Sequence, residues 1–412
     1  MARLKGFQKL TLIDDALRTW LDVLQVKKCR EVAVPLNEAL KRVLAMDLIA
    51  KEDLPRFDRS AVDGYALSAK DTIGASQFTP VTFNLTELEV DSKQAKQIWT
   101  GTPLPKGANA VVMIENTKKR DGKLEVWVQL ATGGNVSKKG EDVKKGEKIM
   151  KAGTRLKPYH LALLAAMGND EAQVVEKPRI AILATGNELA DVGSKPSGNQ
   201  IFESNRIMLA AMCHELGAEP LDLGIAKDDA DEIAEKLKIG LQKCDAVITS
   251  GGTSVGGLDL VPEVVNNSGK PGVVVHGVAL RPAMPTALAT LDGKPVVILS
   301  GNPVAAVIGF EVFARPLISK MLGMRMEEPR PTVNAVMTRK VATALGRKTF
   351  VRVRVSQKNG EFLAEPVSAR GSGAISTMTR GNGFVIVPEN REGVKEGELV
   401  IVRLFGNVEA VN

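Results

Sequence analysis

Residues 244–265, CDAVITSGGTSVGGLDLVPEVV, start as an apolar strand and end as a helix. Glycines and hydroxyls fill the turn between them. Glycine lets a backbone approach another group closely, and the N-terminus of the following helix favours negative charge. A turn of this kind suits a phosphate, although alone it also fits a plain strand-to-helix connection. The turn residues are Ser250, Gly251, Gly252, Thr253, Ser254, Val255, Gly256 and Gly257.

The same rhythm of strand and helix runs through residues 178–328. RIAILATG, EPLDLGIA, DAVITSGG and PVVILSGNP are strand-like, and SNRIMLAAMCHELG, DDADEIAEKLKIGLQK and VAAVIGFEVFARPLISKM are helix-like. Repeated βαβ units predict a three-layer αβα domain around a mainly parallel sheet. Near the start of the chain, TLIDDALRTWLDVLQ (11–25) predicts one more amphipathic helix, with Thr11 as its N-cap.

The remaining regions have a different texture. Residues 55–142 are rich in Gly, Pro and Thr and contain alternating segments such as VTFNLTELEV, which predicts a compact, mostly β unit. Residues 149–170 predict an extended piece, a proline and a helix that ends near Gly168. After the proline-punctuated segment 327–331, the runs TFVRVRV, EFLAEPV, GFVIVPEN and LVIVRLF predict a small all-β C-terminal domain.

Composition excludes several classes of protein. The chain of 412 residues is 44% hydrophobic and 25% charged, which is typical of several globular domains. It has no apolar run of about 18 residues, and its N-terminus is a poor secretory signal, so we expect no membrane span and a cytoplasmic location. The three cysteines and three histidines are scattered, which argues against disulfides or a zinc site.

The net charge of +7 raises the question of nucleic acid. Basic residues are mixed with acids, and aromatic residues make up only 4% of the chain, too few for a base-stacking surface. We therefore expect no nucleic-acid partner and only a modest attraction for small anions.

Three predicted strands of the 178–328 region end in polar, glycine-bearing loops: LATGNEL (183–189), ITSGGTSVGG (248–257) and ILSGNPVAA (298–306). The carboxyl ends of parallel strands meet at one edge of the sheet, where ligands bind. The three loops together therefore predict a cleft for an anionic ligand.

Carboxylates accompany these loops. Glu188 follows the first loop, Asp228 and Asp229 precede a predicted helix, and Asp259 follows the second loop. Carboxylates beside a phosphate site are typical ligands of Mg²⁺. The alternative is that Asp228 or Asp229 caps its helix and that Glu188 is a surface carboxylate. Arg281 supplies a positive charge for the ligand.

Taken together, the motifs resemble those of the MoeA family, the molybdopterin molybdenumtransferases, which are related to the E domain of gephyrin. The resemblance extends from about residue 10 to the end of the chain. It rests on PRFDRSAVDGYAL (55–67), IWTGTPLPKGANAVVMIENT (98–117), GEDVKKG (140–146), TGNEL, ITSGGTSVG and SGNPVAA, in this order.

The resemblance implies a multidomain α/β fold with four parts. Residues 1–26 and 178–328 would form the molybdopterin-binding, MogA-like three-layer domain. Residues 27–50 and 143–177 would form an elongated linker domain, and residues 51–142 a small, mostly β domain that contributes to the active site. Residues 329–412 would form a C-terminal β-barrel-like domain.

The implied reaction inserts molybdate or tungstate into adenylylated molybdopterin, with Mg²⁺ as cofactor and release of AMP. The resemblance also implies a homodimer, with an adenylyltransferase of the MogA or MoaB type as the donor of the substrate. The metal ligands would be Glu188, Asp228 and Asp259.

Family roles fall on two sets of residues. The catalytic set is Asp63, Asp142, Glu188, Asp228 (or its neighbour Asp229), Asp259 and Arg281. The set that binds the molybdopterin substrate is Thr100, Gly101, Thr185, Gly186, Ser250, Gly251, Gly252, Ser254, Gly256, Ser300, Gly301, Asn302 and Pro303. Without the resemblance, Asp63 and Asp142 read as ordinary turn residues.

The chain also departs from the family pattern. Members often have KPGKP where this chain has RPAMP (281–285), so Met284 replaces a lysine. Ser137 stands where an arginine is common, and Gly257 where a glutamate often follows. We expect these changes to alter oxyanion binding, with Lys138 or Lys139 compensating for Ser137.

Two other functions fit parts of the sequence. The first is adenylylation of molybdopterin, because single-domain adenylyltransferases share the TSGGTG-type α/β unit. The second is a gephyrin-like scaffold without catalysis. The four-part layout argues against the first, and the retained acids argue against the second.

Overall fold

The structure is a computed structural model that describes residues 10–253, 260–324, 330–367 and 371–410. The chain forms two compact units. One comprises Met1–Val32 and Val175–Asn412, and the other comprises Ala33–Val174. The second unit is therefore an insertion in the sequence of the first. The division into four domains stays a prediction.

A six-stranded sheet lies at the centre of the larger unit, in the order β16-β13-β17-β21-β20-β18. Its first four strands are parallel, and β20 runs antiparallel to both of its neighbours. The mainly parallel sheet is therefore confirmed. The strands are β13 (Arg179–Thr185), β16 (Glu219–Ala226), β17 (Ala246–Ser250), β18 (Pro271–His276), β20 (Ala287–Leu291) and β21 (Lys294–Leu299).

The strand-and-helix rhythm does not predict β20. Asp292 and Gly293 join β20 to β21, with φ values of 49° and 84°. Two such residues form the tight turn that suits an antiparallel hairpin. The Asp-Gly pair between two apolar runs was the signal for this strand.

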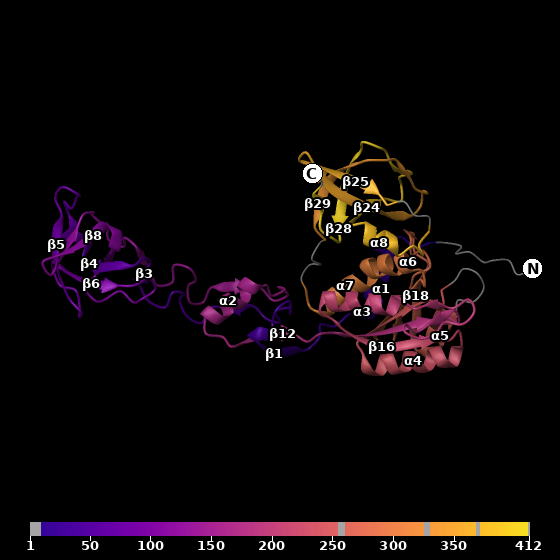
Figure 1. Ribbon diagram of the computed structural model, residues 1–412. Helices are drawn as coiled ribbons and strands as arrows, with labels where there is room; N and C mark the ends of the chain where they lie inside the picture. The colour runs from indigo at the N-terminus through magenta and orange to yellow at the C-terminus, as the bar shows by residue number, and fades with distance from the viewer. Residues whose placement is uncertain (1–9, 254–259, 325–329, 368–370, 411–412) are drawn as a thin grey trace, which may run out of the picture. The chain divides into compact units, whose positions relative to one another are not determined.

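Helices cover both faces of the sheet, which confirms the three layers (Figure 1). α4 (Ala230–Lys243) and α5 (Leu260–Ser268) pack on one face. The other face carries α1 (Ile13–Leu24), α3 (Asn205–Leu216) and a continuous helical segment of α6 (Pro303–Gly309), the π-turn Phe310–Ala314 and α7 (Arg315–Met321). The apolar strands and α4 and α5 share a fully buried core that includes Leu183, Val247, Val261, Val265, Leu237 and Ile298.

The predicted N-cap of α1 is wrong. The helix begins at Ile13, and no side chain caps it. The backbone of Thr11 is extended instead, since its N–H donates to the Gly277 carbonyl at 3.1 Å and its carbonyl accepts from the Ala279 N–H at 2.8 Å. The helix is anchored by Trp20, which is fully buried and donates from Nε1 to the Ala289 carbonyl at 2.9 Å.

A closed five-stranded barrel follows in the same unit. Its strands pair in the cycle β24-β25-β22-β28-β26, and β26 pairs again with β24. The predicted C-terminal β-barrel-like domain is therefore confirmed. Two short strands, β19 (Leu280–Arg281) and β29 (Glu409–Ala410), also pair with β24. The barrel strands are β22 (Thr332–Met337), β24 (Lys348–Lys358), β25 (Glu361–Pro366), β26 (Gly383–Val387) and β28 (Leu399–Leu404).

The smaller unit is built around a six-stranded sheet in the order β7-β4-β6-β5-β9-β8. One face of the sheet buries Tyr65, Leu67, Phe83, Val112 and Leu124. The strands are β4 (Gly64–Leu67), β5 (Val81–Leu85), β6 (Gln94–Ile98), β7 (Ala110–Met113), β8 (Thr117–Arg120) and β9 (Lys123–Val126).

The rest of the smaller unit consists of short strand pairs and one helix. The helix α2 (Pro158–Ala166) starts at the predicted proline and ends two residues before Gly168. The strand pairs are β1 (Glu31–Pro35) with β12 (Glu171–Val175), β2 (Leu48–Ile49) with β11 (Lys148–Met150), and β3 (Arg59–Ser60) with β10 (Val136–Ser137). Among the residues described, no helix is long and apolar enough to cross a membrane.

We expect Trp20→Ala to lower the free energy of unfolding by about 3–5 kcal/mol, because it leaves a large cavity and removes the hydrogen bond to the Ala289 carbonyl. Val23→Ala, at an exposed site on the same helix, is the matched control and should cost less than about 1 kcal/mol. Urea unfolding monitored by circular dichroism measures both. Equal losses in the two variants would contradict the role given to Trp20.

Candidate functional site

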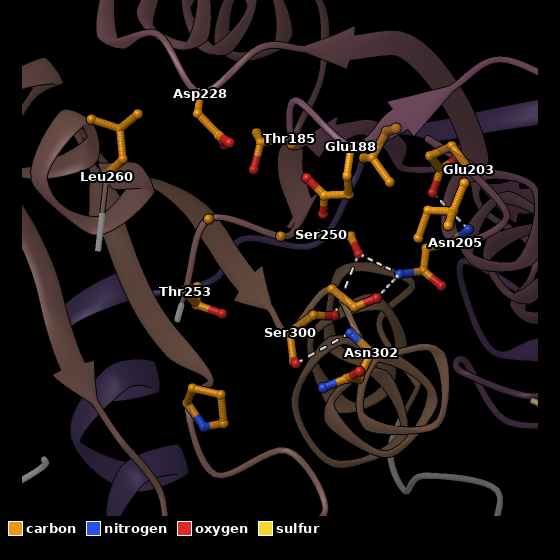
Figure 2. Close-up of a pocket in the computed structure, with 17 residues that line it drawn as sticks. Thr185, Glu188, Glu203, Asn205, Asp228, Ser250, Thr253, Leu260, Ser300 and Asn302 are labelled. Atoms are coloured by element: carbon orange, nitrogen blue, oxygen red, sulfur yellow. Dashed lines mark hydrogen bonds between the residues drawn. The ribbon is translucent and has the colours of Figure 1, made fainter. Parts of the chain in front are cut away.

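A cavity of about 630 Å³ opens at the carboxyl ends of β13, β17 and β21, where the three predicted loops meet (Figure 2). Most of the predicted residues of the larger unit line it. They are Thr185, Gly186, Glu188, Asp228, Ser250, Gly251, Gly252, Ser300, Gly301 and Asn302. Pro303 begins α6 directly after the cavity wall. Ser254, Gly256 and Asp259 lie outside the described residues.

The glycine turn is packed against the protein itself. Gly251 and Gly252 have φ values of 102° and 66°. A Cβ atom on Gly251 would lie 2.3 Å from the Thr185 carbonyl oxygen, and one on Gly252 would lie 2.3 Å from Val261 Cγ2. The two glycines therefore allow the turn to close onto the end of β13 and onto α5.

Gly301 differs from them. A Cβ atom there would meet its nearest neighbour, the Cα of Gly251, at an ordinary 3.5 Å. Gly301 is also exposed and lines the cavity. A side chain at this position would therefore occupy the cavity without displacing the backbone.

Asn205 fixes the distance between two strand ends. Its Nδ2 donates to Ser250 Oγ and to the Gly301 carbonyl, both at 2.8 Å (Figure 2). Asn205 is the first residue of α3, so this one side chain joins the helix to the ends of β17 and β21. Sequence reasoning missed Asn205, although it stands in a polar ESNR segment at the start of a predicted helix.

Glu203 is a second missed residue of the cavity wall. It is only 3% exposed, and it accepts from the N–H groups of Asn205 at 2.7 Å and Arg206 at 3.1 Å. It also accepts from Arg206 Nε at 3.1 Å. Its carboxylate therefore holds the start of α3 in place. The other unpredicted lining residues are Leu189, Ile201, Thr253, Leu260 and Pro285.

Two hydroxyls of the cavity differ in their partners. Ser250 Oγ accepts from Asn205 and lies 3.4 Å from the Ser300 carbonyl. Thr185 Oγ1 is buried and has no hydrogen-bond partner in the part of the chain that the structure describes. Since buried polar groups normally have partners, an unpaired hydroxyl in a cavity wall suits a ligand with oxygen atoms.

The carboxylates Glu188 and Asp228 both line the cavity, and Asn187 links the two segments that carry them. Asn187 and Asp228 exchange hydrogen bonds between backbone N–H and side chain, both at 3.2 Å. Glu188 follows Asn187, and its carboxylate folds back over Gly186, where a Cβ atom would lie 2.6 Å from Glu188 Oε2. Asp229 instead accepts from the Glu232 N–H at 2.9 Å and caps α4. Of these two neighbouring aspartates, Asp228 therefore lines the cavity and Asp229 caps the helix.

These two carboxylates are a candidate metal site. Within the described residues there is no group of three or more His, Cys, Asp or Glu side chains that could hold a metal ion. Mg²⁺ does not require such a group, since it usually takes one or two carboxylates together with waters and substrate phosphates. Glu188 and Asp228 fit that ligand set.

Arg281 lies in a neighbouring cavity of about 1060 Å³, between the RPAMP segment and the barrel. This cavity shares Pro285, Ser300 and Asn302 with the first one. The described residues that line it include no acid but five cations: Arg281, Arg339, Lys340, Arg347 and Arg352.

Arg352 is the most unusual of these cations. Among the described residues, its Nε is buried without a hydrogen-bond partner, and burial lowers the pKa of its guanidinium. A partly buried guanidinium with an unused donor is costly unless an anion pairs with it. The cavity therefore has the positive charge for an oxyanion.

The smaller unit holds the remaining predicted residues. Asp63 Oδ1 accepts from the backbone N–H of Thr100 at 2.8 Å and from its hydroxyl at 2.7 Å. The bond from the backbone N–H has the larger effect, and the two bonds together hold the pKa of Asp63 below its usual value. Gly101 follows in the same turn with φ 84°. Asp142 is exposed on another turn, where its N–H donates to the Leu54 carbonyl at 3.1 Å.

The expected compensation for Ser137 involves lysines that already have partners. Lys138 Nζ lies 2.8 Å from Asp58, and Lys139 Nζ lies 3.5 Å from Asp53. Ser137 itself bonds to Glu141. Both lysine side chains are at least half exposed, so the ion pairs are weak and leave both lysines able to exchange partners.

Comparison with known proteins gives matches along most of the chain. Residues 11–168 match the family described as the MoeA N-terminal region (domain I and II), residues 181–320 the probable molybdopterin binding domain, and residues 334–405 the MoeA C-terminal region (domain IV). A putative molybdopterin biosynthesis protein of Methanocaldococcus jannaschii is 38% identical, over 98% of each chain.

Two further relatives agree. The molybdopterin molybdenumtransferase of Bacillus subtilis is 37% identical, over 90% of this chain and 89% of its own. The crystal structure of a molybdopterin biosynthesis moeA protein from Pyrococcus horikoshii OT3 matches with a TM-score of 0.81 and 33% identity, over 96% of this chain and all of that one.

We expect Gly251→Val to lower the melting temperature by several degrees, because its side chain collides with the Thr185 carbonyl and the positive φ disfavours a branched residue. Gly301→Val is the matched control from the same cavity and should melt close to the unmodified protein. Differential scanning calorimetry measures both. A Gly251→Val protein as stable as Gly301→Val would show that the turn is less tightly packed than described.

We expect Thr100→Val to raise the pKa of Asp63 partway toward the ordinary aspartate value, because only the hydroxyl bond is lost and the backbone N–H remains. The Asp63 carboxylate is stabilised in the folded state, so its contribution to stability is present at neutral pH and is lost as the pH falls through its lowered pKa. Carbon-13 NMR of labelled aspartate gives the titration. An unchanged pKa would mean that the hydroxyl bond is not formed in solution.

Proposed function

Because the chain belongs to the MoeA family, we propose that it acts in molybdenum cofactor biosynthesis as a molybdopterin molybdenumtransferase. In this proposal it takes adenylylated molybdopterin and molybdate or tungstate, inserts the metal and releases AMP. One observation carries it: a cavity lined by the carboxylates Glu188, Glu203 and Asp228 adjoins a cavity lined by five cations and, among the described residues, no acid.

The first cavity suits the phosphoanhydride of the substrate. The N–H of Gly252 would donate to phosphate oxygens, and so would the hydroxyl of Thr185 once it turns toward the cavity. The N–H of Gly251 already donates to the Leu299 carbonyl at 3.1 Å and instead fixes the turn against β21. Anhydride cleavage depends on such positioning and charge stabilisation more than on a covalent nucleophile.

We propose that Glu188 and Asp228 hold Mg²⁺ together with phosphate oxygens of the substrate. The ion would neutralise the negative charge that builds up as the anhydride breaks. Asn187 would support this task, because its exchange of hydrogen bonds with Asp228 orients that carboxylate. Asp259, the third carboxylate suggested by the family pattern, would join them.

The second cavity suits the oxyanion. Arg281, Arg347 and Arg352 would attract a dianion, and the unused Nε–H of Arg352 would donate to it. Ser300 and Asn302 line both cavities, so the oxyanion would lie beside the bound substrate. Cleavage of the anhydride takes up one water and yields AMP and molybdopterin. Formation of the metal–sulfur bonds returns the two dithiolene protons with an oxo group as water.

The remaining roles are proposed on the family pattern. The protein would act as a cytoplasmic homodimer, and Asp63, Thr100 and Asp142 would act on the substrate from the small β-rich domain of a second copy. An adenylyltransferase of the MogA or MoaB type would deliver the adenylylated substrate.

The experiment is to incubate the purified protein with adenylylated molybdopterin and Mg²⁺, with and without molybdate or tungstate, and to measure AMP by chromatography. We expect release of AMP that depends on the oxyanion. Glu188→Ala should slow this release by about 100-fold or more, because it removes charge stabilisation of the transition state. Glu235→Ala, an exposed acid on α4 away from the cavity, should leave the rate unchanged.

The other outcomes separate the rival functions. Pyrophosphate release from ATP and molybdopterin would indicate an adenylyltransferase, and no turnover of either substrate would indicate a scaffold. A full rate in Glu188→Ala would remove that residue from the catalytic set.

A further inference from the structure

An exposed tryptophan stands on a rigid turn at one edge of the six-stranded sheet in the smaller unit. Trp99 directly follows β6 and is 54% exposed. Its carbonyl accepts from both the N–H and the hydroxyl of Thr102, at 3.1 and 2.6 Å, and the N–H of Gly101 donates to the Ser60 carbonyl at 2.8 Å. The turn therefore fixes the backbone that carries this exposed aromatic side chain.

The ends of three neighbouring strands bring Trp99 near Asp63. Gly64 of β4 pairs with Ile98 on one side and with Met113 on the other. Asp63, Trp99 and Ile114 come directly next to these paired residues. The Ile114 N–H donates to the Asp63 carbonyl at 3.1 Å, and Thr100, which follows Trp99, donates to the Asp63 carboxylate. The backbone of Asp63 therefore lies between the segments that carry the indole and the apolar side chain.

Only half of the Asp63 carboxylate is used within the protein. Both bonds from Thr100 end on Oδ1. Among the described residues, no donor reaches Oδ2. These bonds also keep the pKa of Asp63 low, so the group is an anion and a pure acceptor at neutral pH.

The apolar surface around this acceptor is not a lone exposed residue. Ile114, which directly follows the neighbouring strand β7, is 40% exposed. A flat aromatic face beside a fixed acceptor is a common way to hold a planar ring that carries N–H groups, because stacking and hydrogen bonding act together.

We propose that Trp99 stacks on a planar nitrogen heterocycle of the substrate and that Asp63 Oδ2 accepts one of its N–H groups. The pterin and the adenine of an adenylylated pterin both have this chemistry. The proposal rests on the proposed function and names residues that position the substrate, with Trp99 determining part of the affinity.

The test compares Trp99→Phe, Trp99→Leu and Trp99→Ala in the full-length protein. Phe78→Ala is the matched control, because Phe78 is 94% exposed in the same unit but lies on a different turn. AMP release gives KM and kcat, and isothermal titration with free pterin and with AMP gives binding without turnover. We expect Trp99→Leu and Trp99→Ala to raise KM about 10-fold with little change in kcat.

The same two variants should weaken binding of one of the two probes about 10-fold, and that probe identifies the ring that Trp99 holds. Trp99→Phe, which keeps an aromatic face, should retain most of the affinity, whereas a purely structural role would not separate Phe from Leu.

Several results overturn the proposal. The first is that the unmodified protein releases AMP and Trp99→Ala has the same KM and the same binding of both probes; the proposed function would then stand without this role of Trp99. The second is that Trp99→Ala changes the sedimentation of the protein without changing its binding of either probe. That result would assign this face to contact between copies of the chain. If the unmodified protein releases no AMP, the proposed function fails, and the probe titrations still decide the role of Trp99.

Discussion

The cavity depends on the pair of hydrogen bonds that Asn205 donates. Its amide bonds to Ser250 at the end of β17 and to Gly301 after β21, at 2.8 Å each. The two loops are also joined directly, since the Gly251 N–H donates to the Leu299 carbonyl at 3.1 Å, but the Asn205 side chain ties both of them to α3. The Asn205 Oδ1 atom is buried and has no partner among the described residues, which costs stability.

The loops at the carboxyl ends of the parallel strands were predictable because the pattern that marks them is local in the sequence. Glycine-bearing loops after apolar runs mark the ends of parallel strands, and the topology of such sheets brings those ends together. The role of Asn205 was not predictable, since its partners lie 45 and 96 residues away and no periodic pattern links them. The choice between Asp228 and Asp229 likewise needed the helix start, because either one could have been the cap. β20 was missed for another reason: a two-residue hairpin interrupted the rhythm from which the sheet was deduced.

Arg281 lines the cavity beside the barrel, together with Ser300 and Asn302 of the third glycine-bearing loop. The sequence could not show that four more cations, from the barrel, line the same cavity, because they are distant along the chain. Glu188 and Asp228, with Glu203, line one cavity and the five cations line the adjoining one, and Ser300 and Asn302 line both. This separation prevents Glu188 and Asp228 from neutralising the arginines. A metal cation and an oxyanion can then be attracted at the same time to neighbouring positions.

The closed barrel has a consequence for how copies of the chain meet. In an open sheet, the outermost strand offers unpaired amide and carbonyl groups to a neighbour. Here each of the five barrel strands already has a partner on both sides. Backbone augmentation by a neighbouring molecule is therefore blocked around this ring. Any contact through the barrel has to be made by outward-facing side chains, such as the exposed Leu399 and Ile401 of β28.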